Sequence, residues 1–507
     1  MASYLLGIDV STTGSKAVLI DANGRVVRTA TNPHPLHTPR PAWSEQDPAD
    51  WWRASAASIR TVLQTSGVSP DQIAGVGLTG QMHGLVLLDA EGRVLRPAIL
   101  WNDQRTAAEC AEITETVGAE QVLRITGNPV LPGFTAPKII WVRLREPEVF
   151  RQTAKFLLPK DYVRYRLTGA FVSDVSDASG TSLFDVGARN WSDEMLQALG
   201  IPREWVPEVT ESPEVSARVS AEGARETGLL EGTPVVSGAG DNAAAAVGTG
   251  IVRPGRVLLS LGTSGVLFAP LDAYRPEPQG RLHAFCHAVP GQWHLMGVML
   301  SAAGSLQWYH DALAEDVPFD QLVAEAGTVP PGAEGLFFLP YLSGERTPYP
   351  DPDARGAFIG LSLRHRRPHL TRAVLEGVAF GLRDSLDLMT ALGLEIRRVR
   401  AAGGGTRSPV WRQILADVLN TELATTDATE GAAYGAALLA GVGAGVFASV
   451  QDAAEIAVKE VDCVQPGPDA GLYAVAHAQY RSLYPALAPE FRKIARLAES
   501  QAAATQA

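Results

Sequence analysis

The chain has 507 residues, more than one hydrophobic core usually organises, so two domains of similar size are expected. Hydrophobic residues make up 46% and charged residues 19% of the sequence, which excludes an intrinsically disordered protein. The formal net charge of −12 argues against non-specific binding of nucleic acid, because such binding needs a basic surface. An anionic small-molecule substrate remains compatible, since a local site can be electropositive within an acidic protein.

The sequence contains three cysteines, Cys110, Cys286 and Cys463. A small and odd number of cysteines does not indicate a disulfide framework and is consistent with a reducing compartment. The N-terminus has no basic region and meets an acidic residue at Asp9, so it does not resemble a signal peptide. We therefore expect a cytoplasmic protein.

The first elements predicted along the chain form a hairpin. A strand over 4–9 is followed by a turn of small residues at 11–14, and a second strand over 17–20 ends at the turn signal Asn23-Gly24. The pattern recurs with a strand over 257–261, a turn at 262–265 and a strand over 266–268. Two such hairpins, one near the start of each half, suggest an internal duplication, although short hairpins can also coincide by chance.

Helical and apolar extended stretches alternate between and after these hairpins. Helices are predicted over 48–64, 107–117, 136–145 and 369–392, which places the chain in the α/β class. The Gly- and Ala-rich stretch 232–255 is the expected domain junction. We expect an N-terminal domain over 1–246, a C-terminal domain over 247–470, and C-terminal helices over 471–507 that pack back on the first domain.

The stretch 431–450 carries no charge and contains GxxxG spacings, which are also found in membrane-spanning helices. It is mostly Ala and Gly, and Gly441, Gly443 and Gly445 would interrupt a spanning helix. A short buried helix ending near Gly441 is the better interpretation.

Several familiar motifs are absent or misplaced. No Gly-Lys dipeptide occurs, so there is no Walker A loop. The GxGxxG match at 75–80 precedes another apolar strand, whereas a dinucleotide fingerprint requires a following helix. The group His283, Cys286, His287 and His294 lies in apolar segments and is better explained as packed core residues than as a zinc site.

Two acidic residues stand in settings suited to phosphate chemistry. Asp9 precedes the Ser/Thr turn at 11–14, where backbone N–H groups can cradle phosphate and the carboxylate can hold Mg²⁺. Asp241 lies among the small residues 238–242, which allow a substrate to approach and leave the carboxylate able to accept a hydroxyl proton. The plainer alternatives are a turn aspartate for Asp9 and a helix N-cap for Asp241.

Longer segments connect these pieces to a known family. Residues 356–376 (GAFIGLSLRHRRPHLTRAVLE) and 133–141 (GFTAPKIIW) resemble the two signatures of the FGGY carbohydrate kinases, and the resemblance extends from the first strand to about residue 450. It implies an actin-like, ribonuclease H-like fold with two α/β domains and a deep interdomain cleft. It also implies an ATP-dependent sugar kinase that uses Mg²⁺.

The same resemblance assigns roles to residues. The turns at 9–16 and 262–265 match the two phosphate-binding loops, and Asp241 matches the base that deprotonates the sugar hydroxyl. Mg²⁺ is expected near Asp9 and Asp241. The residues expected to contact ATP are Thr12, Thr13, Lys16, Thr263, Gln307, Gly404 and Ser408. Ser11 and Ala303 depart from the family pattern, since glycine is common at both positions.

The sugar specificity rests on Met82 and His83, which resemble the family branch that phosphorylates D-xylulose, whereas the glycerol branch has Arg-Glu at this place. Asn242 fits the same branch, and Trp101, Met82, His83, Asp241 and Asn242 are the expected sugar-contacting residues. A kinase for another pentulose or a sugar acid, of the ribulokinase type, is the nearest alternative. More distant alternatives are a non-catalytic sugar-binding protein and an actin-like assembly ATPase on the same fold. The resemblance also implies a homodimer, because dimers are common in this family.

Overall fold

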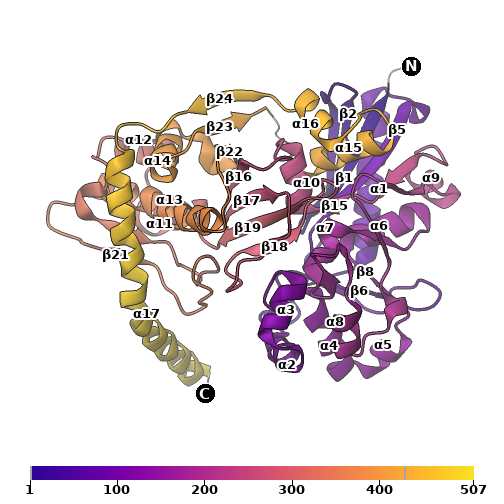
Figure 1. Cartoon of the computed structure of the whole chain (residues 1–507), viewed down its shortest axis with the longest axis horizontal. Coiled ribbons are helices and arrows are strands. Elements are labelled where there is room, and N and C mark those ends of the chain that lie inside the picture. The colour runs from indigo at the N-terminus through magenta and orange to yellow at the C-terminus, as the bar shows by residue number, and fades with distance from the viewer. Residues whose placement is uncertain (1–2, 428–429, 507) are drawn as a thin grey trace.

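The computed structural model describes residues 3–427 and 430–506, with side chains up to residue 497. Two lobes, each built around a seven-stranded sheet, lie side by side (Figure 1). The strands of the first sheet are β1 (Tyr4–Val10), β2 (Gly14–Asp21), β3 (Val26–Pro33), β5 (Ile73–Gly80), β13 (Val215–Arg218), β14 (Pro234–Val236) and β15 (Ala239–Gly240). Those of the second are β16 (Arg256–Leu261), β17 (Gly265–Leu271), β18 (His283–Cys286), β19 (Trp293–Met299), β22 (Arg398–Ala402), β23 (Leu423–Thr426) and β24 (Glu460–Val464).

Helices cover both sheets. Those of the first half are α1 (Pro48–Ser66), α2 (Ala107–Val117), α3 (Ala119–Thr126), α4 (Thr135–Arg145), α5 (Pro147–Gln152), α6 (Pro159–Thr168), α7 (Val175–Ala178), α8 (Asp193–Ala198), α9 (Ala221–Thr227) and α10 (Asp241–Gly248). Those of the second half are α11 (Ala303–Leu313), α12 (Phe319–Ala326), α13 (Arg367–Ala391), α14 (Pro409–Leu419), α15 (Gly431–Gly443), α16 (Val450–Ala457) and α17 (Ala470–Gln506). The helices predicted over 48–64, 107–117, 136–145 and 369–392 are therefore confirmed within three residues at each end.

Short two-stranded ribbons complete the lobes. They are β4 (Glu45–Gln46) with β7 (Ala98–Ile99), β6 (Val86–Leu88) with β8 (Lys155–Leu157), β9 (Val172–Asp174) with β12 (Glu208–Thr210), β10 (Phe184–Asp185) with β11 (Asn190–Trp191), and β20 (Phe337–Leu339) with β21 (Ala357–Ile359).

The two sheets share one topology, as the repeated hairpins predicted. In the first, β1 pairs antiparallel with β2 and β2 with β3, while β1, β5 and β14 run parallel and β13 closes the edge antiparallel. In the second, β16 pairs antiparallel with β17 and β17 with β19, while β16, β22 and β23 run parallel and β24 closes the edge antiparallel. Six strands in the same order and orientation indicate duplication of one unit.

A pair of helices crosses between the lobes. α15 comes from the second half of the sequence, yet it packs on the first sheet, where Ala433 and Ala437 share a core cluster with Leu5 and Val18. α10 follows the first sheet in sequence, yet its Ala246 packs with Leu258 and Phe268 of the second. The domain boundary expected at residue 246 falls inside α10.

Glycines allow the close approach of α15 to its neighbours. A Cβ atom on Gly435 would lie 1.8 Å from the carbonyl oxygen of Ala244 in α10, and one on Gly7 would lie 1.9 Å from that of Ala433. The small residues of the 431–450 stretch therefore serve helix and sheet packing, as the buried-helix interpretation predicted. Within residues 3–427 and 430–506, none of the helices combines the length with the apolar character that a membrane span requires.

The C-terminal helix α17 packs on the second lobe. Tyr473, Tyr480 and Phe491 belong to the same core cluster as α13 and α14, and the Tyr473 hydroxyl donates a hydrogen bond to Glu376 Oε1 at 2.7 Å. In Figure 1 the helix runs along the outer side of the second lobe. The expectation that residues 471–507 pack back on the first domain was therefore wrong, because the helix's aromatic side chains meet an apolar surface of the second lobe that the sequence did not reveal.

Candidate active site

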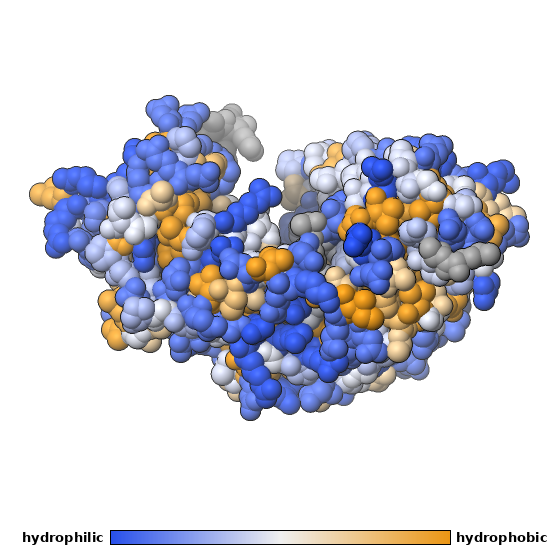
Figure 2. Space-filling view, turned by 90° about the horizontal axis from the view of Figure 1, so that it is seen from above, coloured by the Kyte–Doolittle hydropathy of each residue, from blue (hydrophilic) through white to orange (hydrophobic). Residues whose placement is uncertain are grey.

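Three strands of the first sheet end together at the side facing the second lobe. Asp9 in β1 lies opposite Thr79 in β5, and Gly240 in β15 lies opposite Gly80. All three strands run parallel, so the residues that follow them gather at one edge of the sheet. This register brings together Asp9, the Met82-His83 pair after β5, and Asp241 after β15. The space-filling view shows the surface hollowed where the lobes meet (Figure 2).

Asp9 and Asp241 form an acidic pair. Burial, reinforced by the charge of Asp241 and opposed by that of Lys16, raises the pKa of Asp9 to about 7. Burial also raises the pKa of Asp241 to about 6. The Asp241 Oδ1 atom accepts hydrogen bonds from the backbone N–H of Asn242 at 2.7 Å and from its side-chain amide at 3.0 Å. The Asn242 amide group thus holds the carboxylate in place.

The fit to Mg²⁺ depends on Asp9. Its Oδ1 atom is buried and has no hydrogen-bond partner, which is costly for a carboxylate oxygen unless a ligand completes its surroundings. Mg²⁺ in phosphoryl-transfer enzymes is commonly held by one or two carboxylates together with substrate phosphates and water. Asp9 and Asp241 supply two carboxyl groups, a number that such a site uses.

His83 is held in a defined orientation. Its backbone has φ 69°, a conformation that few non-glycine residues adopt, and its carbonyl oxygen accepts hydrogen bonds from Lys138 Nζ at 2.8 Å and Thr135 Oγ1 at 3.1 Å. The imidazole stacks on Phe134 with ring centroids 4.4 Å apart. Burial lowers the pKa of His83 to about 3, so the ring is neutral. Nδ1, 2.6 Å from the carbonyl oxygen of Gly180, must carry the proton, which leaves Nε2 as a hydrogen-bond acceptor.

Met82 supplies an apolar surface next to the acid. A Cβ on Gly240 would lie 2.9 Å from the Met82 sulfur, and one on Gly180 would lie 3.1 Å from its terminal methyl group. Glycine at both positions therefore leaves room for the thioether between the segment bearing Asp241 and the segment that holds His83.

The turn at 11–14, which the sequence predicted to bind phosphate, is tied together by Ser11. Its hydroxyl donates to the carbonyl oxygen of Gly14 at 2.8 Å and accepts from the Gly14 N–H at 3.3 Å. Thr12 Oγ1 accepts a hydrogen bond from Trp101 Nε1 at 3.0 Å, which connects Trp101 to this turn. Thr13 is exposed at the tip of the turn. Lys16 forms an ion pair of 2.9 Å with Glu430.

The second turn lies at the mouth of a cavity in the second lobe. The Thr263 carbonyl oxygen accepts the N–H groups of Ala302 at 2.8 Å and Gly304 at 3.1 Å, which fixes the turn to the start of α11. The cavity measures about 730 Å³, a volume typical of small-molecule sites. Thr263, Gln307, Gly404 and Ser408, the four predicted nucleotide residues of this half, all line it.

Other lining residues were not predicted. Phe319, Val323 and Val410 supply apolar walls, and Asp320 and Arg407 supply charge. They come from α12 and from the region around the start of α14, and no motif marks them. Their role follows only from the folding of distant segments around one cavity.

The histidine group interpreted as core is buried without a metal arrangement. His283 contacts Asn128 Oδ1 at 2.7 Å, His287 contacts the carbonyl oxygen of Ile251 at 2.9 Å, and His294 stacks on Phe268. Burial lowers the pKa of all three histidines. All three histidine side chains are buried, which is the packed arrangement that the sequence predicted.

Comparison with known proteins identifies the family. Residues 4–248 match the N-terminal domain, and residues 257–444 the C-terminal domain, of the FGGY family of carbohydrate kinases. The chain belongs to the FGGY family of carbohydrate kinases. This confirms the predicted enzyme class.

Individual FGGY relatives match most of the chain. The xylulose kinase of Escherichia coli K12 is 47% identical over 82% of this chain and 85% of its own length. The xylulose kinase of Bacillus subtilis is 39% identical over 95% and 96%, respectively. The crystal structure of xylulose kinase from Rhodospirillum rubrum, 35% identical, superposes with a TM-score of 0.91 over 96% of this chain and all of that one. The predicted two-domain α/β fold is thereby confirmed.

Proposed function

We propose that this FGGY kinase transfers the γ-phosphoryl group of ATP to D-xylulose, giving ADP and D-xylulose 5-phosphate. The observation that carries the proposal is the convergence of Asp241, Met82-His83 and the unpartnered Asp9 oxygen at one sheet edge, opposite a nucleotide-sized cavity. The high identity to xylulose kinases over most of the chain supports the choice of sugar.

The sugar is oriented by polar and apolar contacts. The neutral His83 ring accepts a hydrogen bond from a sugar hydroxyl at Nε2, because its Nδ1–H is already bonded to Gly180. Met82 packs against the carbon chain of the sugar, and Asn242 keeps Asp241 turned toward the pocket. An epimeric ketose would misplace one hydroxyl against these groups, at a cost of about 1–3 kcal/mol.

Asp241 acts as the general base. The 5-hydroxyl oxygen forms a bond to the γ-phosphorus as the bond from that phosphorus to the β,γ-bridging oxygen breaks, and the hydroxyl proton passes to the Asp241 carboxylate. A pKa of about 6 leaves Asp241 mostly ionised at neutral pH and close enough to neutrality to accept the proton. Asp9 and Asp241 would hold Mg²⁺ together with the phosphates of ATP, where the metal would supply positive charge for the phosphoryl oxygens.

Nucleotide contacts come from both lobes. Thr12 and Thr13 of the first turn and Thr263 of the second would face the phosphates, and Gln307, Gly404 and Ser408 would line the adenosine. Lys16 would leave its ion pair with Glu430 or share it when the phosphates enter. Trp101 would close the sugar site over Thr12.

The test is ADP release with Mg-ATP against D-xylulose, L- and D-ribulose, L-xylulose, glycerol, gluconate and no sugar. The proposal expects the highest kcat/KM for D-xylulose. A higher value for another ketose or for gluconate would keep the kinase and refute the sugar assignment. ADP release at the no-sugar rate throughout would refute the whole proposal.

We further propose a cytoplasmic homodimer. Cys110 and Cys286 are buried free thiols and Cys463 is an exposed one, which suits a reducing compartment. Light scattering coupled to gel filtration would give the mass in solution directly. A mass equal to the 53.8 kDa of one chain would refute the dimer.

A further inference from the structure

A short segment behind the sugar pocket contacts three parts of the site. It consists of α7 and the 3₁₀ turn Ser179–Thr181. The Ser176 hydroxyl oxygen accepts the N–H of Gly240 at 3.1 Å, directly before Asp241. The Ser179 hydroxyl oxygen accepts the N–H of Cys286 in β18 at 3.0 Å, and the Gly180 carbonyl oxygen contacts His83.

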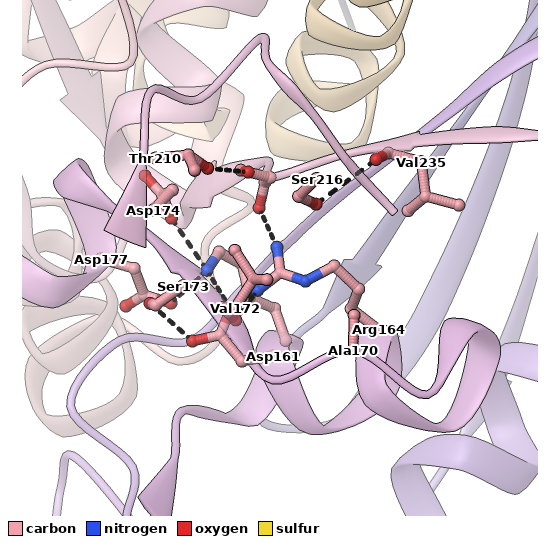
Figure 3. Close-up of polar contacts among 12 residues, drawn as sticks. Asp161, Arg164, Ala170, Val172, Ser173, Asp174, Asp177, Thr210, Ser216 and Val235 are labelled. Atoms are coloured by element: carbon pink, nitrogen blue, oxygen red, sulfur yellow. Dashed lines mark hydrogen bonds and ion pairs between the residues drawn. The ribbon is translucent and has the colours of Figure 1, made fainter. Parts of the chain in front are cut away.

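A buried charge cluster anchors this segment (Figure 3). Lys160 Nζ lies 2.6 Å from Asp161, 2.8 Å from Asp174 and 3.1 Å from Asp177, and all four side chains have no solvent exposure. Arg164 forms an ion pair of 2.5 Å with Asp161. Three carboxylates thus face two cations, and burial raises the pKa of Asp177 well above its usual value.

The charge cluster is hydrogen-bonded to both ends of the loop 237–240, which precedes Asp241. Arg164 Nη1 donates to the carbonyl oxygen of Ser237 at 2.5 Å. At the other end, the Ser176 hydroxyl donates to Asp174 Oδ2 at 2.5 Å, which directs its oxygen lone pairs toward the Gly240 N–H. The loop 237–240 is therefore held at one end by Arg164 and at the other by Asp174, which acts through the Ser176 hydroxyl.

Asp174 itself has little freedom to turn. Its Oδ1 faces Lys160, while Oδ2 accepts the backbone N–H of Ser176 at 2.8 Å and the hydroxyl of Ser212 at 3.0 Å as well as that of Ser176. The orientation of the Ser176 hydroxyl follows from this fixed carboxylate. Of the two serine hydroxyls on Asp174 Oδ2, that of Ser176 is the one that also contacts the loop before Asp241.

We propose that Ser176, oriented by Asp174 within the buried charge cluster, is a positioning residue that sets the place of Asp241 for proton transfer. The proposal rests on the proposed role of Asp241 as the base. Its physical reason is that catalytic rates fall steeply with small displacements, since about 1 Å of misplacement can cost 10²-fold. Without the hydroxyl, the buried Gly240 N–H loses its acceptor and the start of α10 shifts to find another.

The experiment compares Ser176→Ala with Ser212→Ala, which removes a hydrogen bond to the same Asp174 oxygen but leaves Gly240 untouched. We expect Ser176→Ala to lower kcat about 10–100-fold with the KM for Mg-ATP within about twofold of wild type. We expect Ser212→Ala to stay within about threefold of wild type. Equal kcat values for the two variants, whether high or low, would overturn the proposal.

A double-mutant cycle with Asp241→Asn separates positioning from a general loss of structure. If Ser176 acts through Asp241, Ser176→Ala adds no further loss in the Asp241→Asn background. The same fold-loss in both backgrounds would overturn the proposal. An Asp241→Asn variant with wild-type turnover would instead refute the base role itself, so the two failures are distinguishable.

Ser176→Cys keeps the experiment decisive if the alanine variant does not fold. Sulfur is a weak acceptor of nearly the same size, so this variant keeps the volume and loses most of the hydrogen bond to Gly240. We expect about a tenfold lower kcat with the KM for Mg-ATP within about twofold of wild type, at unchanged thermal stability. Wild-type kcat would overturn the proposal.

Discussion

Asp241 combines a raised pKa with a carboxylate pinned on one side by Asn242. Replacing it by alanine removes the proton acceptor and leaves the nucleotide cavity in the other lobe intact. We expect Asp241→Ala to lower kcat by about 10²–10⁴-fold while ATP still binds, as measured by ADP release and by calorimetric titration of ATP. Turnover within tenfold of wild type would remove Asp241 from the base role.

His83 offers a second test at the scale of single residues. His83→Ala deletes one sugar hydrogen bond and the stack on Phe134, so we expect the KM for D-xylulose to rise roughly tenfold, the equivalent of about 1.4 kcal/mol. The KM for Mg-ATP should not change. An equal rise in the KM values for D-xylulose and Mg-ATP, measured in the same initial-rate series, would indicate a purely structural histidine.

The acidic pair predicts a pH dependence with a definite sign. The pKa values of about 7 for Asp9 and about 6 for Asp241 mean that both carboxyls take up protons as the pH falls from 8 to 5, so kcat/KM should fall over this range. In the proposed site Mg²⁺ would compete with the proton at Asp9, so raising Mg²⁺ should move this acid limb to lower pH. A limb that does not move with Mg²⁺ concentration would separate Asp9 from the metal.

The same pKa shifts affect stability. Both carboxyls have folded-state pKa values above the usual 3.8, so their ionisation destabilises the fold progressively as the pH rises from about 4 to about 7. Asp9→Asn should therefore melt at a higher temperature than the metal-free wild type at pH 8, and the difference should narrow at pH 5. A lower melting temperature at pH 8 would contradict the burial of an uncompensated charge.

The residues that lie next to a recognisable turn were the ones that sequence reasoning could find. Asp9 lies near the end of β1 and Asp241 directly follows β15, so both lie at the edge where the strands end. Ser176 gave no such signal, because its importance depends on Gly240, 64 positions away. The ion pair of Lys16 with Glu430 could not be predicted for the same reason, because the two residues are far apart in the sequence.

At the scale of helices and strands, the close contact between α10 and α15 makes the strongest demand on sequence. We expect Gly435→Ala to destabilise the protein by several kcal/mol or to prevent folding, because the new methyl group would lie 1.8 Å from the Ala244 carbonyl oxygen, and both atoms belong to rigid helices. Urea unfolding checks this result. Gly471→Ala, which has open space around it on α17, is the matched control and should be neutral or slightly stabilising.

Helix and strand positions were largely predictable because hydrophobic periodicity and turn residues are local properties. α1 illustrates this, since Asp47 caps its first turn, Pro48 begins it and Gly67 ends it with φ 73°. Packing partners were not predictable in the same way. α17 was expected on the first lobe, but Tyr473 joins the buried pair Arg372 and Glu376 of α13.

At the scale of the whole molecule, each lobe has its own core, and damage to one core should stay local. Tyr480 is buried against Phe380 and Tyr341 of the second lobe. We expect Tyr480→Ala to cost roughly 3–5 kcal/mol and to speed hydrogen exchange in β16 and β22 while β1 and β5 keep their protection. Val475→Ala, at a position 73% exposed on the same helix, is the control and should have little effect. Equal loss of protection in both lobes would mean that they unfold as one unit.

The helix α15 also has a consequence for synthesis of the protein. The face of the first sheet that it covers includes Gly7 and Gly77, whose backbones lie directly against its carbonyl groups. These strands leave the ribosome early, but the helix that covers them is formed by residues 431–443, which are synthesised much later. The N-terminal lobe therefore cannot finish folding during translation until most of the second lobe has emerged, and its uncovered sheet is a natural target for a chaperone in the interval.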